Sequence, residues 1–217
     1  MIVVRGKQAQ EMDAAALAEA IGPYESVVVD VGAGDGRFAY RYAQEHPARF
    51  VIGVDPVREN LRELSAKAAR KPARGGLPNV LYVVASIEQV PQGLRAIASE
   101  IYVTLPWGSL MRGIILAEAA VLEGLASLAK DGAVLHIVLN TRIFDDPVPL
   151  DVRDLPDVTP EYVRDVLAPA YARHGIEIGG VRFMDADEVA AISTTWAKRL
   201  SHRAPPRSVA IEAVVRR

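Results

Sequence analysis

The stretch VVVDVGAGDGR, residues 27–37, joins a valine-rich run to three closely spaced glycines. The run predicts a buried strand, because short β-branched segments bounded by glycine are typical of the central strands of a parallel sheet. Glycine lets the backbone turn and approach a ligand at places where a Cβ atom would collide. The stretch therefore predicts a strand that ends in a ligand-binding turn.

The spacing of the glycines indicates which ligand the turn binds. A dinucleotide turn has the pattern G-x-G-x-x-G/A, whose third small residue leaves the following helix open to a pyrophosphate. Here the pattern is G-x-G-x-G, at Gly32, Gly34 and Gly36. Arg37 occupies the third position of the dinucleotide pattern, and Asp30 would repel a pyrophosphate but suit a cation. S-adenosyl-L-methionine, which carries an ammonium and a sulfonium group, is therefore the predicted cofactor.

Residues at the ends of later strands extend this cofactor site. Asp55 ends the next predicted strand, 23 residues after Gly32, where a carboxylate can accept hydrogen bonds from both ribose hydroxyls, and Pro56 follows it. The alternative is that the glycines form only a turn and that Asp55 only caps a helix. The two aspartates together favour the cofactor. Three residues after the third strand are expected to border the adenine, the second with its side chain against the ring face: Ser86, Ile87 and Glu88.

The whole chain alternates strand and helix patterns, which predicts a Rossmann-like, doubly wound α/β fold with a mostly parallel sheet. We predict one domain over residues 1–217, with an N-terminal extension at 1–12 and an irregular linker or lid at 141–158. Strands are predicted at 27–31, 50–54, 79–85, 100–105, 133–139, 176–183 and 208–215. Helices are predicted at 13–21, 37–46, 56–71 and 111–130, from 160, and at 186–200, with Asp13 capping the first and 130–132 ending the long one.

Composition excludes several classes of protein. The formal net charge is −2, so contact with a nucleic acid has to come from local patches and not from uniform positive charge. The absence of cysteine excludes disulfides, thiol nucleophiles and cysteine zinc sites, and the four histidines add no metal pattern, so no metal is predicted. Without a long apolar run, we expect a soluble, cytoplasmic protein that contacts no membrane.

The fourth strand ends in TLPWG, residues 104–108, at the edge where open α/β sheets bind ligands. We expect Thr104 to border the cofactor and Trp107 to face the substrate. Enzymes that methylate the amino nitrogen of adenine often carry Asp or Asn here, and this chain does not. A ring nitrogen such as adenine N1 has a free lone pair and needs no base. Trp196 could complete a sandwich around one flipped base, although each tryptophan could instead be an ordinary core anchor.

Positive charge gathers in two places. Residues 64–79 hold four basic residues and no acidic one, in a loop whose proline and glycines indicate exposure and mobility, and residues 196–217 hold six basic residues and one glutamate. These are candidate phosphate contacts, although a charge run can also be only a solvated face. The predicted RNA-binding residues are Lys67, Arg70, Lys71, Arg74, Arg199, Arg203 and Arg207.

Five segments together resemble a known family over nearly the full chain: DVGAGDGR (30–37), IGVDPVRENL (52–61), KPARGGLPNVLYV (71–83), LPWGSL (105–110) and WAKRL (196–200). The family is the aminoglycoside-resistance 16S ribosomal RNA (adenine-N1) methyltransferases, which modify decoding-site adenine 1408 within the 30S subunit. The resemblance implies a class I S-adenosylmethionine-dependent methyltransferase fold with a seven-stranded sheet, and methyl transfer to that adenine. Its partner would be 16S rRNA within the 30S subunit, bound by a monomer.

The resemblance also implies roles for single residues. Pro106 would present its backbone carbonyl to the target base, which would stack between Trp107 and Trp196, and Thr194 would lie near the cofactor. Position 66 is alanine where a close relative has lysine. Two alternatives stay open: a small-molecule methyltransferase that uses 141–158 as a substrate lid, and a 30S-binding homologue with weak activity.

Overall fold

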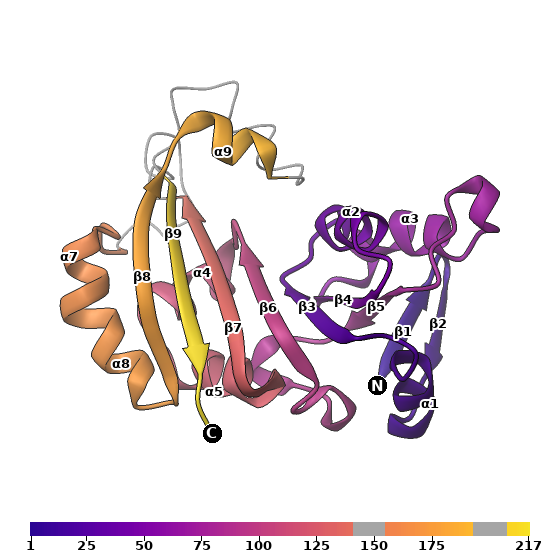
Figure 1. Ribbon diagram of the computed structural model, residues 1–217, viewed down its shortest axis with the longest axis horizontal. Helices are drawn as coiled ribbons and strands as arrows, with labels where there is room; N and C mark the ends of the chain where they lie inside the picture. The colour runs from indigo at the N-terminus through magenta and orange to yellow at the C-terminus, as the bar shows by residue number, and fades with distance from the viewer. Residues whose placement is uncertain (141–154, 193–207) are drawn as a thin grey trace.

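The computed structural model describes residues 1–140, 155–192 and 208–217. In these residues a single nine-stranded sheet carries helices on both faces, with the strand order β2-β1-β5-β4-β3-β6-β7-β9-β8 (Figure 1). The strands are β1 (Ile2–Arg5), β2 (Gln8–Glu11), β3 (Ser26–Val31), β4 (Arg49–Asp55), β5 (Val80–Val84), β6 (Ala98–Thr104), β7 (Ala129–Asn140), β8 (Ile176–Met184) and β9 (Ser208–Val215).

Two groups of helices cover the two faces of the sheet. The longer helices are α1 (Ala14–Ile21), α2 (Arg37–Glu45), α3 (Arg58–Ala68), α4 (Gly108–Ile115) and α5 (Ala119–Leu128), and the shorter ones are α7 (Pro160–Tyr162), α8 (Ala168–Ala172) and α9 (Ala186–Ala191). Short 3-10 turns are η1 (Pro72–Arg74), η2 (Ile87–Gln89) and η3 (Gln92–Leu94), and η5 (Val163–Leu167) is a π-helix. Helices α2 and α3 bury one apolar cluster, and α1, α4, α5 and α8 bury a larger one on the other face.

The sheet confirms the predicted α/β class. Strands β5, β4, β3, β6 and β7 are parallel, and β9 and β8 continue the sheet in antiparallel pairs. The strand count is nine and not seven, because the N-terminal extension forms a hairpin, β1–β2, that pairs with β5. The sequence of β2 is polar and all four of its residues are exposed, so it lacks the alternation that signals a strand.

The strand order indicates which edge of the sheet binds a ligand. Strand β3 is paired with β4 on one side and with β6 on the other. The strand order therefore reverses beside β3, because β4 and β5 extend the sheet on one side of it and β6 and β7 on the other. In open α/β sheets the crevice outside the carboxyl ends of such strands binds the ligand. The turn after β3, Asp55 at the end of β4 and Thr104 at the end of β6 all lie at this edge.

The prediction of one continuous helix over 111–130 is wrong in two ways. It is divided into α4 and α5 at Ala117, whose φ of 53° is left-handed, and Lys130–Gly132 belong to β7 and do not end a helix. A Cβ on Gly113 would overlap Val121 Cγ2, so the two helices pack closely against each other there. The Asp13 cap is confirmed, because its Oδ1 accepts a hydrogen bond from Ala16 N at 2.8 Å.

Only parts of two other predicted segments can be compared with the structure. Residues 141–154 of the predicted linker lie outside the described residues, whereas Leu155 and Val158 are buried in the larger core cluster. Of the helix predicted at 186–200, α9 is described, and its N-cap Asp185 forms a capping box with Glu188. No helix in the described ranges is long and apolar enough to cross a membrane.

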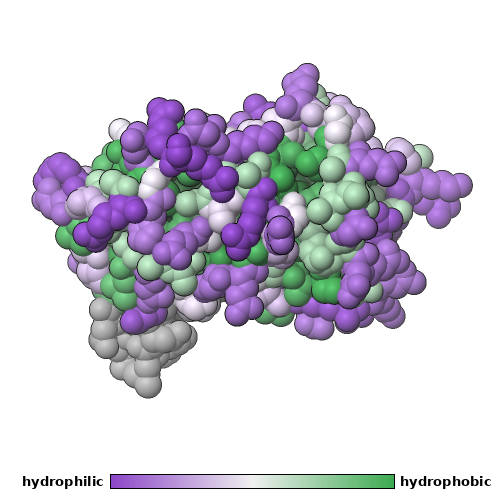
Figure 2. Space-filling view, turned by 90° about the horizontal axis from the view of Figure 1, so that it is seen from below, coloured by the Kyte–Doolittle hydropathy of each residue, from purple (hydrophilic) through white to green (hydrophobic). Residues whose placement is uncertain are grey.

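The surface carries few large exposed apolar side chains. Seen from below, hydrophilic and hydrophobic residues are interspersed (Figure 2). In the described part of the chain the exposed large hydrophobic residues are Ile2, Val57, Trp107, Leu116, Val166 and Phe183.

Candidate functional site

The glycine turn after β3 has the left-handed backbone that its sequence predicts. The φ angles of Gly32, Gly34 and Gly36 are 71°, 54° and 74°. A Cβ on Gly36 would overlap the ring of Tyr82, and one on Gly32 would lie 2.6 Å from Leu110 Cδ2. A Cβ on Gly34 would have no neighbour within 4 Å. Packing against the Tyr82 ring therefore requires glycine at position 36. Gly32 meets only the movable end of the Leu110 side chain, and Gly34 leaves open space at the sheet edge.

Asp55 ties this turn to the next strand. Its Oδ2 accepts a hydrogen bond from Gly34 N at 2.9 Å, and its Oδ1 accepts one from Val57 N at 2.8 Å and one from Asn60 Nδ2 at 3.3 Å. A carboxylate has about four lone-pair positions, so acceptor capacity remains for a ligand hydroxyl. Asp55 does not cap α3, because the N-cap is Val57 and no side chain caps the helix. Its carboxylate instead orders the residues between β4 and α3.

Asp30 is a buried carboxylate that lacks a compensating charge. It is 2% exposed, and its Oδ2 has no hydrogen-bond partner. Burial, and to a smaller extent the charges of Asp55 and Asp35, raise the pKa of Asp30 to about 7, against the opposing effect of a backbone hydrogen bond with Ala39. An uncompensated buried carboxylate is costly unless a cation neutralises it. The site therefore fits a ligand with a positive group, such as the ammonium of S-adenosylmethionine.

The turn after β6 presents an exposed indole beside the glycine turn. Leu105 has a left-handed φ of 50°, and its N donates to Val138 O at 2.8 Å. Pro106 is buried, and Trp107 follows as the N-cap residue of α4 with 42% of its surface exposed. An exposed tryptophan does not act as a core anchor, which removes that alternative for Trp107. Backbone strain of this kind concentrates at functional sites.

The predicted adenine border lies in the coil and turn after β5. Ser86 is partly exposed and Glu88 is exposed, so both are available at the surface. Ile87 is only 4% exposed and belongs to the larger core cluster, where α5 packs against η2. This departs from the expectation of an Ile87 side chain against the adenine face: its side chain contributes to packing instead.

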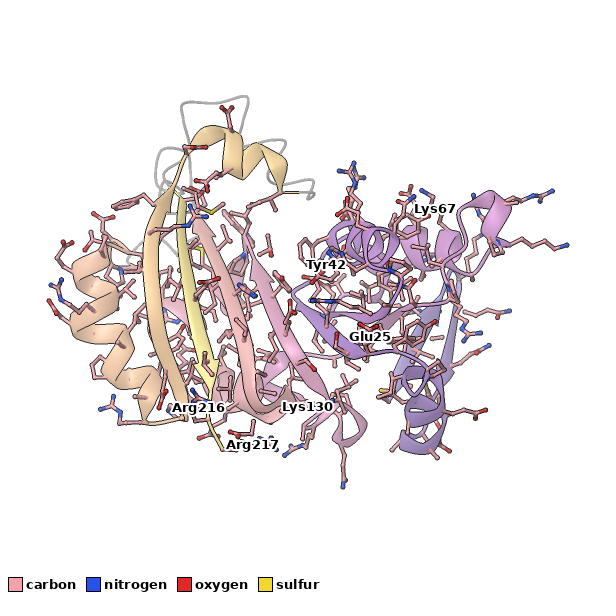
Figure 3. The ribbon with its side chains drawn as sticks, in the orientation of Figure 1. Glu25, Tyr42, Lys67, Lys130, Arg216 and Arg217 are labelled. Atoms are coloured by element: carbon pink, nitrogen blue, oxygen red, sulfur yellow. The ribbon has the colours of Figure 1, made fainter. Side chains whose placement is uncertain are left out.

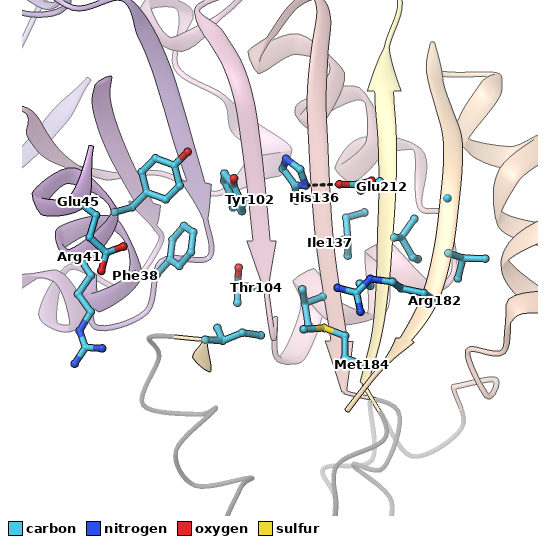
Figure 4. Close-up of a pocket in the computed structure, with 17 residues that line it drawn as sticks. Phe38, Arg41, Glu45, Tyr102, Thr104, His136, Ile137, Arg182, Met184 and Glu212 are labelled. Atoms are coloured by element: carbon cyan, nitrogen blue, oxygen red, sulfur yellow. Dashed lines mark ion pairs between the residues drawn. The ribbon is translucent and has the colours of Figure 1, made fainter. Parts of the chain in front are cut away.

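A pocket of about 510 Å³ opens on the α2 side of the sheet and reaches Thr104 at the end of β6 (Figure 4). Phe38 and Tyr102 lie along the seam between α2 and β6, with ring centroids 5.0 Å apart. His136 stacks on Tyr102 at 4.6 Å and lies 3.4 Å from Glu212. Thr104 therefore lies where the pocket meets the ligand-binding edge.

Four of the predicted RNA contacts lie at the end of α3 and in the protruding loop that follows it. Lys67 is in the last turn of α3, and Arg70, Lys71 and Arg74 are exposed in the loop that leads to β5. The other predicted contacts, Arg199, Arg203 and Arg207, lie outside the described residues, as do Trp196 and Thr194. Their proximity to the sheet edge stays a prediction.

Structure adds two residues that sequence reasoning missed. Tyr82 fills the space below Gly36 and donates its hydroxyl to Gly36 O at 3.0 Å, and Leu110 packs against Gly32. Tyr82 reaches the turn only because β5 pairs with β4, and Leu110 only because α4 returns over β3. Neither arrangement has a local signal in the sequence. Ala66 faces Gly6 of the β1–β2 hairpin, where a Cβ on Gly6 would lie 3.0 Å from Ala66 Cβ.

Alanine substitutions at two glycines are expected to separate folding from ligand binding. Gly36→Ala forces a Cβ into Tyr82 at a left-handed φ, so we expect a loss of roughly 2–5 kcal/mol in unfolding free energy. Gly34→Ala has no clash and should cost only about 1–2 kcal/mol, but it fills the open space and should lower cofactor affinity about tenfold or more. Urea unfolding and calorimetric titration measure both. Equal losses of unfolding free energy in the two variants, or an unchanged cofactor affinity in Gly34→Ala, would contradict these separate roles of the two glycines.

Comparisons with known proteins agree over nearly the whole chain. A family model described as "16S rRNA (adenine(1408)-N(1))-methyltransferase" matches residues 2–215. A protein of that name from Streptoalloteichus hindustanus is 40% identical over 198 residues, which cover 91% of this chain and 91% of the relative. One from Escherichia coli is 33% identical over 202 residues, covering 93% of this chain and 92% of the relative.

Solved structures show the same similarity in three dimensions. A crystal structure of a Trp→Ala mutant of the 16S rRNA (adenine(1408)-N(1))-methyltransferase from Catenulisporales acidiphilia, with cosubstrate SAM, superposes with a TM-score of 0.93 at 42% identity. The match covers 100% of this chain and 97% of that one. The 16S rRNA methyltransferase KamB gives a TM-score of 0.92 at 37% identity, with 100% of both chains covered.

Proposed function

Because the chain belongs to the 16S rRNA (adenine(1408)-N(1))-methyltransferase family, we propose that it methylates N1 of adenine 1408 within the 30S subunit and so confers aminoglycoside resistance. The observation that carries the proposal is a buried Asp30 carboxylate whose Oδ2 has no hydrogen-bond partner, at the same sheet edge as an exposed Trp107. Asp30 is suited to a cationic methyl donor, and Trp107 is suited to a planar base.

Residues on three strands would hold the donor. Asp30 would pair with the ammonium group, Asp55 would accept the ribose hydroxyls, and the backbone of Gly32 and Gly34 would line the ligand. Pro56, Ser86, Glu88 and Thr104 complete the proposed contacts, together with Thr194. S-adenosylmethionine, when bound, supplies a methyl carbon made electrophilic by its sulfonium.

The acceptor needs positioning more than acid–base chemistry. The lone pair of adenine N1 lies in the ring plane and can form the new N–C bond directly, while the electrons of the breaking C–S bond stay on sulfur. No proton has to leave N1, so no general base is required, and the base becomes cationic. Trp107 would stack on the base from one side, Trp196 from the other, and the Pro106 carbonyl would accept from its amino group. Correct orientation is then the main contribution of the protein.

Docking on the ribosome would use local charge. The net charge of −2 gives no overall attraction to RNA, so the basic residues Lys67, Arg70, Lys71 and Arg74 would contact phosphates, with Arg199, Arg203 and Arg207. We propose that the protein acts as a monomer. We propose that it works in the cytoplasm, where 30S subunits are.

The proposed 30S requirement has a direct test. The protein is incubated with methyl-labelled S-adenosylmethionine and, separately, 30S subunits, 50S subunits and protein-free 16S rRNA. We expect label in the 30S sample only, and less of it as salt rises, because phosphate contacts release counterions. Equal labelling of protein-free rRNA would contradict the 30S requirement. Labelling of added metabolites without the 30S subunit would favour a small-molecule methyltransferase.

A further inference from the structure

Tyr40 of α2 connects the helix after the glycine turn to the basic loop after α3. The residue is 4% exposed and its ring lies in the core cluster beneath α2 and α3. Its hydroxyl nevertheless donates a hydrogen bond to Gly75 O at 2.6 Å, 35 residues away in sequence. On the same ring, Lys67 Nζ lies 4.3 Å from the centroid, within the range of a cation–π contact (Figure 3 labels Lys67).

The loop that Tyr40 holds has a closely defined backbone. Gly75 has a left-handed φ of 82°, and a Cβ there would lie 3.0 Å from both Lys67 Cε and Tyr40 Oη. Lys71 O accepts hydrogen bonds from Arg74 N at 2.8 Å and Gly76 N at 3.1 Å. The loop therefore has internal hydrogen bonds that its proline and glycines did not predict. The hydroxyl of Tyr40 links Gly75 to α2, and Asn79 Nδ2 links the end of the loop to Ala43 O of α2 at 2.8 Å.

We propose that Tyr40 is a positioning residue that sets the shape of the basic loop for rRNA docking. Lys67 lies at the end of α3, and Arg70, Lys71 and Arg74 lie in this loop, while 64–79 contains no acidic residue to orient these four cations. The Tyr40 hydroxyl fixes the end of the loop and its ring fixes the ammonium of Lys67. A loop that already has its bound shape loses less conformational freedom on binding, so affinity rises without a new contact. The inference rests on the proposed function of the loop.

Tyr40→Phe tests the proposal because it removes the hydroxyl and keeps the ring in the core. We expect 30S affinity to fall several-fold, with KM for 30S rising, while kcat at saturating 30S and affinity for S-adenosylmethionine stay unchanged. Tyr40→Leu removes the ring as well, so it should weaken 30S binding further and lower the slope of log affinity against log salt by about one phosphate contact. Both are measured on the full chain with purified 30S subunits.

Tyr171→Phe is the matched control. Tyr171 is also fully buried and its hydroxyl also donates to a backbone oxygen, Ile114 O at 2.9 Å, but on the opposite face of the sheet. It should lower thermal stability without changing 30S affinity. Gly75→Ala changes the acceptor side of the Tyr40–Gly75 hydrogen bond, because its Cβ would lie 3.0 Å from Tyr40 Oη. It should weaken 30S binding as Tyr40→Phe does.

Failure of the positioning role and failure of the proposed function give different results. If the wild-type protein labels 30S subunits and Tyr40→Phe binds them as tightly as Tyr171→Phe does, the positioning role is overturned and the proposed function stands. If the wild-type protein neither binds nor labels 30S subunits, the proposed function itself fails. An equal loss of 30S affinity in Tyr171→Phe would also overturn the inference, since it would show a general effect of lost stability.

Discussion

Asp30→Asn is expected to lower the affinity for S-adenosylmethionine by roughly 150- to 5000-fold, since truncating one partner of a buried charge pair typically costs roughly 3–5 kcal/mol. The asparagine keeps the shape of the side chain and its ability to accept a hydrogen bond, but it lacks the charge that would neutralise an ammonium group. Calorimetric titration measures the affinity. Asp13→Asn is a matched control, because it makes the same change of charge on α1 and retains a residue that caps the helix.

The same substitution should stabilise the ligand-free protein above pH 7. The folded protein holds a proton on Asp30 up to a pKa of about 7, whereas an aspartate in the unfolded chain releases it near its ordinary pKa of 3.8. The unfolded state therefore binds fewer protons in this window, and stability falls as pH rises from about 4 to 7. Asparagine removes that cost, so Asp30→Asn should gain up to a few kcal/mol at pH 8 and little at pH 4.

Cofactor affinity should change with pH in the opposite direction. Only the ionised Asp30 attracts an ammonium group, so wild-type affinity should rise with pH until about pH 7 and then level off. In Asp30→Asn this rise should be absent. An affinity that is flat between about pH 5 and 8 in the wild-type protein, or tight binding by Asp30→Asn, would show that Asp30 does not hold the cation.

Trp107→Ala is expected to reduce kcat roughly 10- to 100-fold, because stacking on one base contributes on the order of 1–3 kcal/mol. Its indole is 42% exposed and at the start of α4, so its loss should change thermal stability little. Affinity for S-adenosylmethionine should be unchanged, and Trp107→Phe should restore part of the rate. Single-turnover methylation of 30S subunits measures the chemical step.

Phe183→Ala is the control for this substitution. Phe183 is 50% exposed on β8, so its removal deletes a comparable exposed aromatic ring. It should leave the rate as it is. A normal rate in Trp107→Ala, or a loss of cofactor affinity as large as the loss of rate, would contradict a stacking role for Trp107.

Much of the fold could be predicted because its central strands have strong local signals. The valine-rich run before Gly32 and the alternation of strands and helices predict the parallel centre of the sheet. The hairpin at 2–11 was missed because its outer strand is polar. The break at Ala117 was missed because helix propensity continues through it, whereas close packing of Gly113 on Val121 turns the chain back. Such contacts are tertiary, and a local pattern does not contain them.

The residues of the site also fall into those that local sequence patterns predict and those that depend on tertiary contacts. Asp30, Asp55 and Trp107 could be placed at one edge because each lies at or just after the carboxyl end of a strand, and parallel strands end together. Burial of Ile87 under α5 and the support of the turn by Tyr82 depend on neighbours distant in sequence. The anchoring of Gly75 by Tyr40 is of the same kind.

Primer extension across adenine 1408 tests the central claim most directly. The wild-type protein is incubated with S-adenosylmethionine and 30S subunits, and the extracted 16S rRNA is copied by reverse transcriptase. A methyl group on N1 blocks base pairing, so we predict that extension stops just before adenine 1408, and that the stop is absent with Asp30→Asn. Read-through at that position in rRNA that has incorporated the labelled methyl group would contradict the claim.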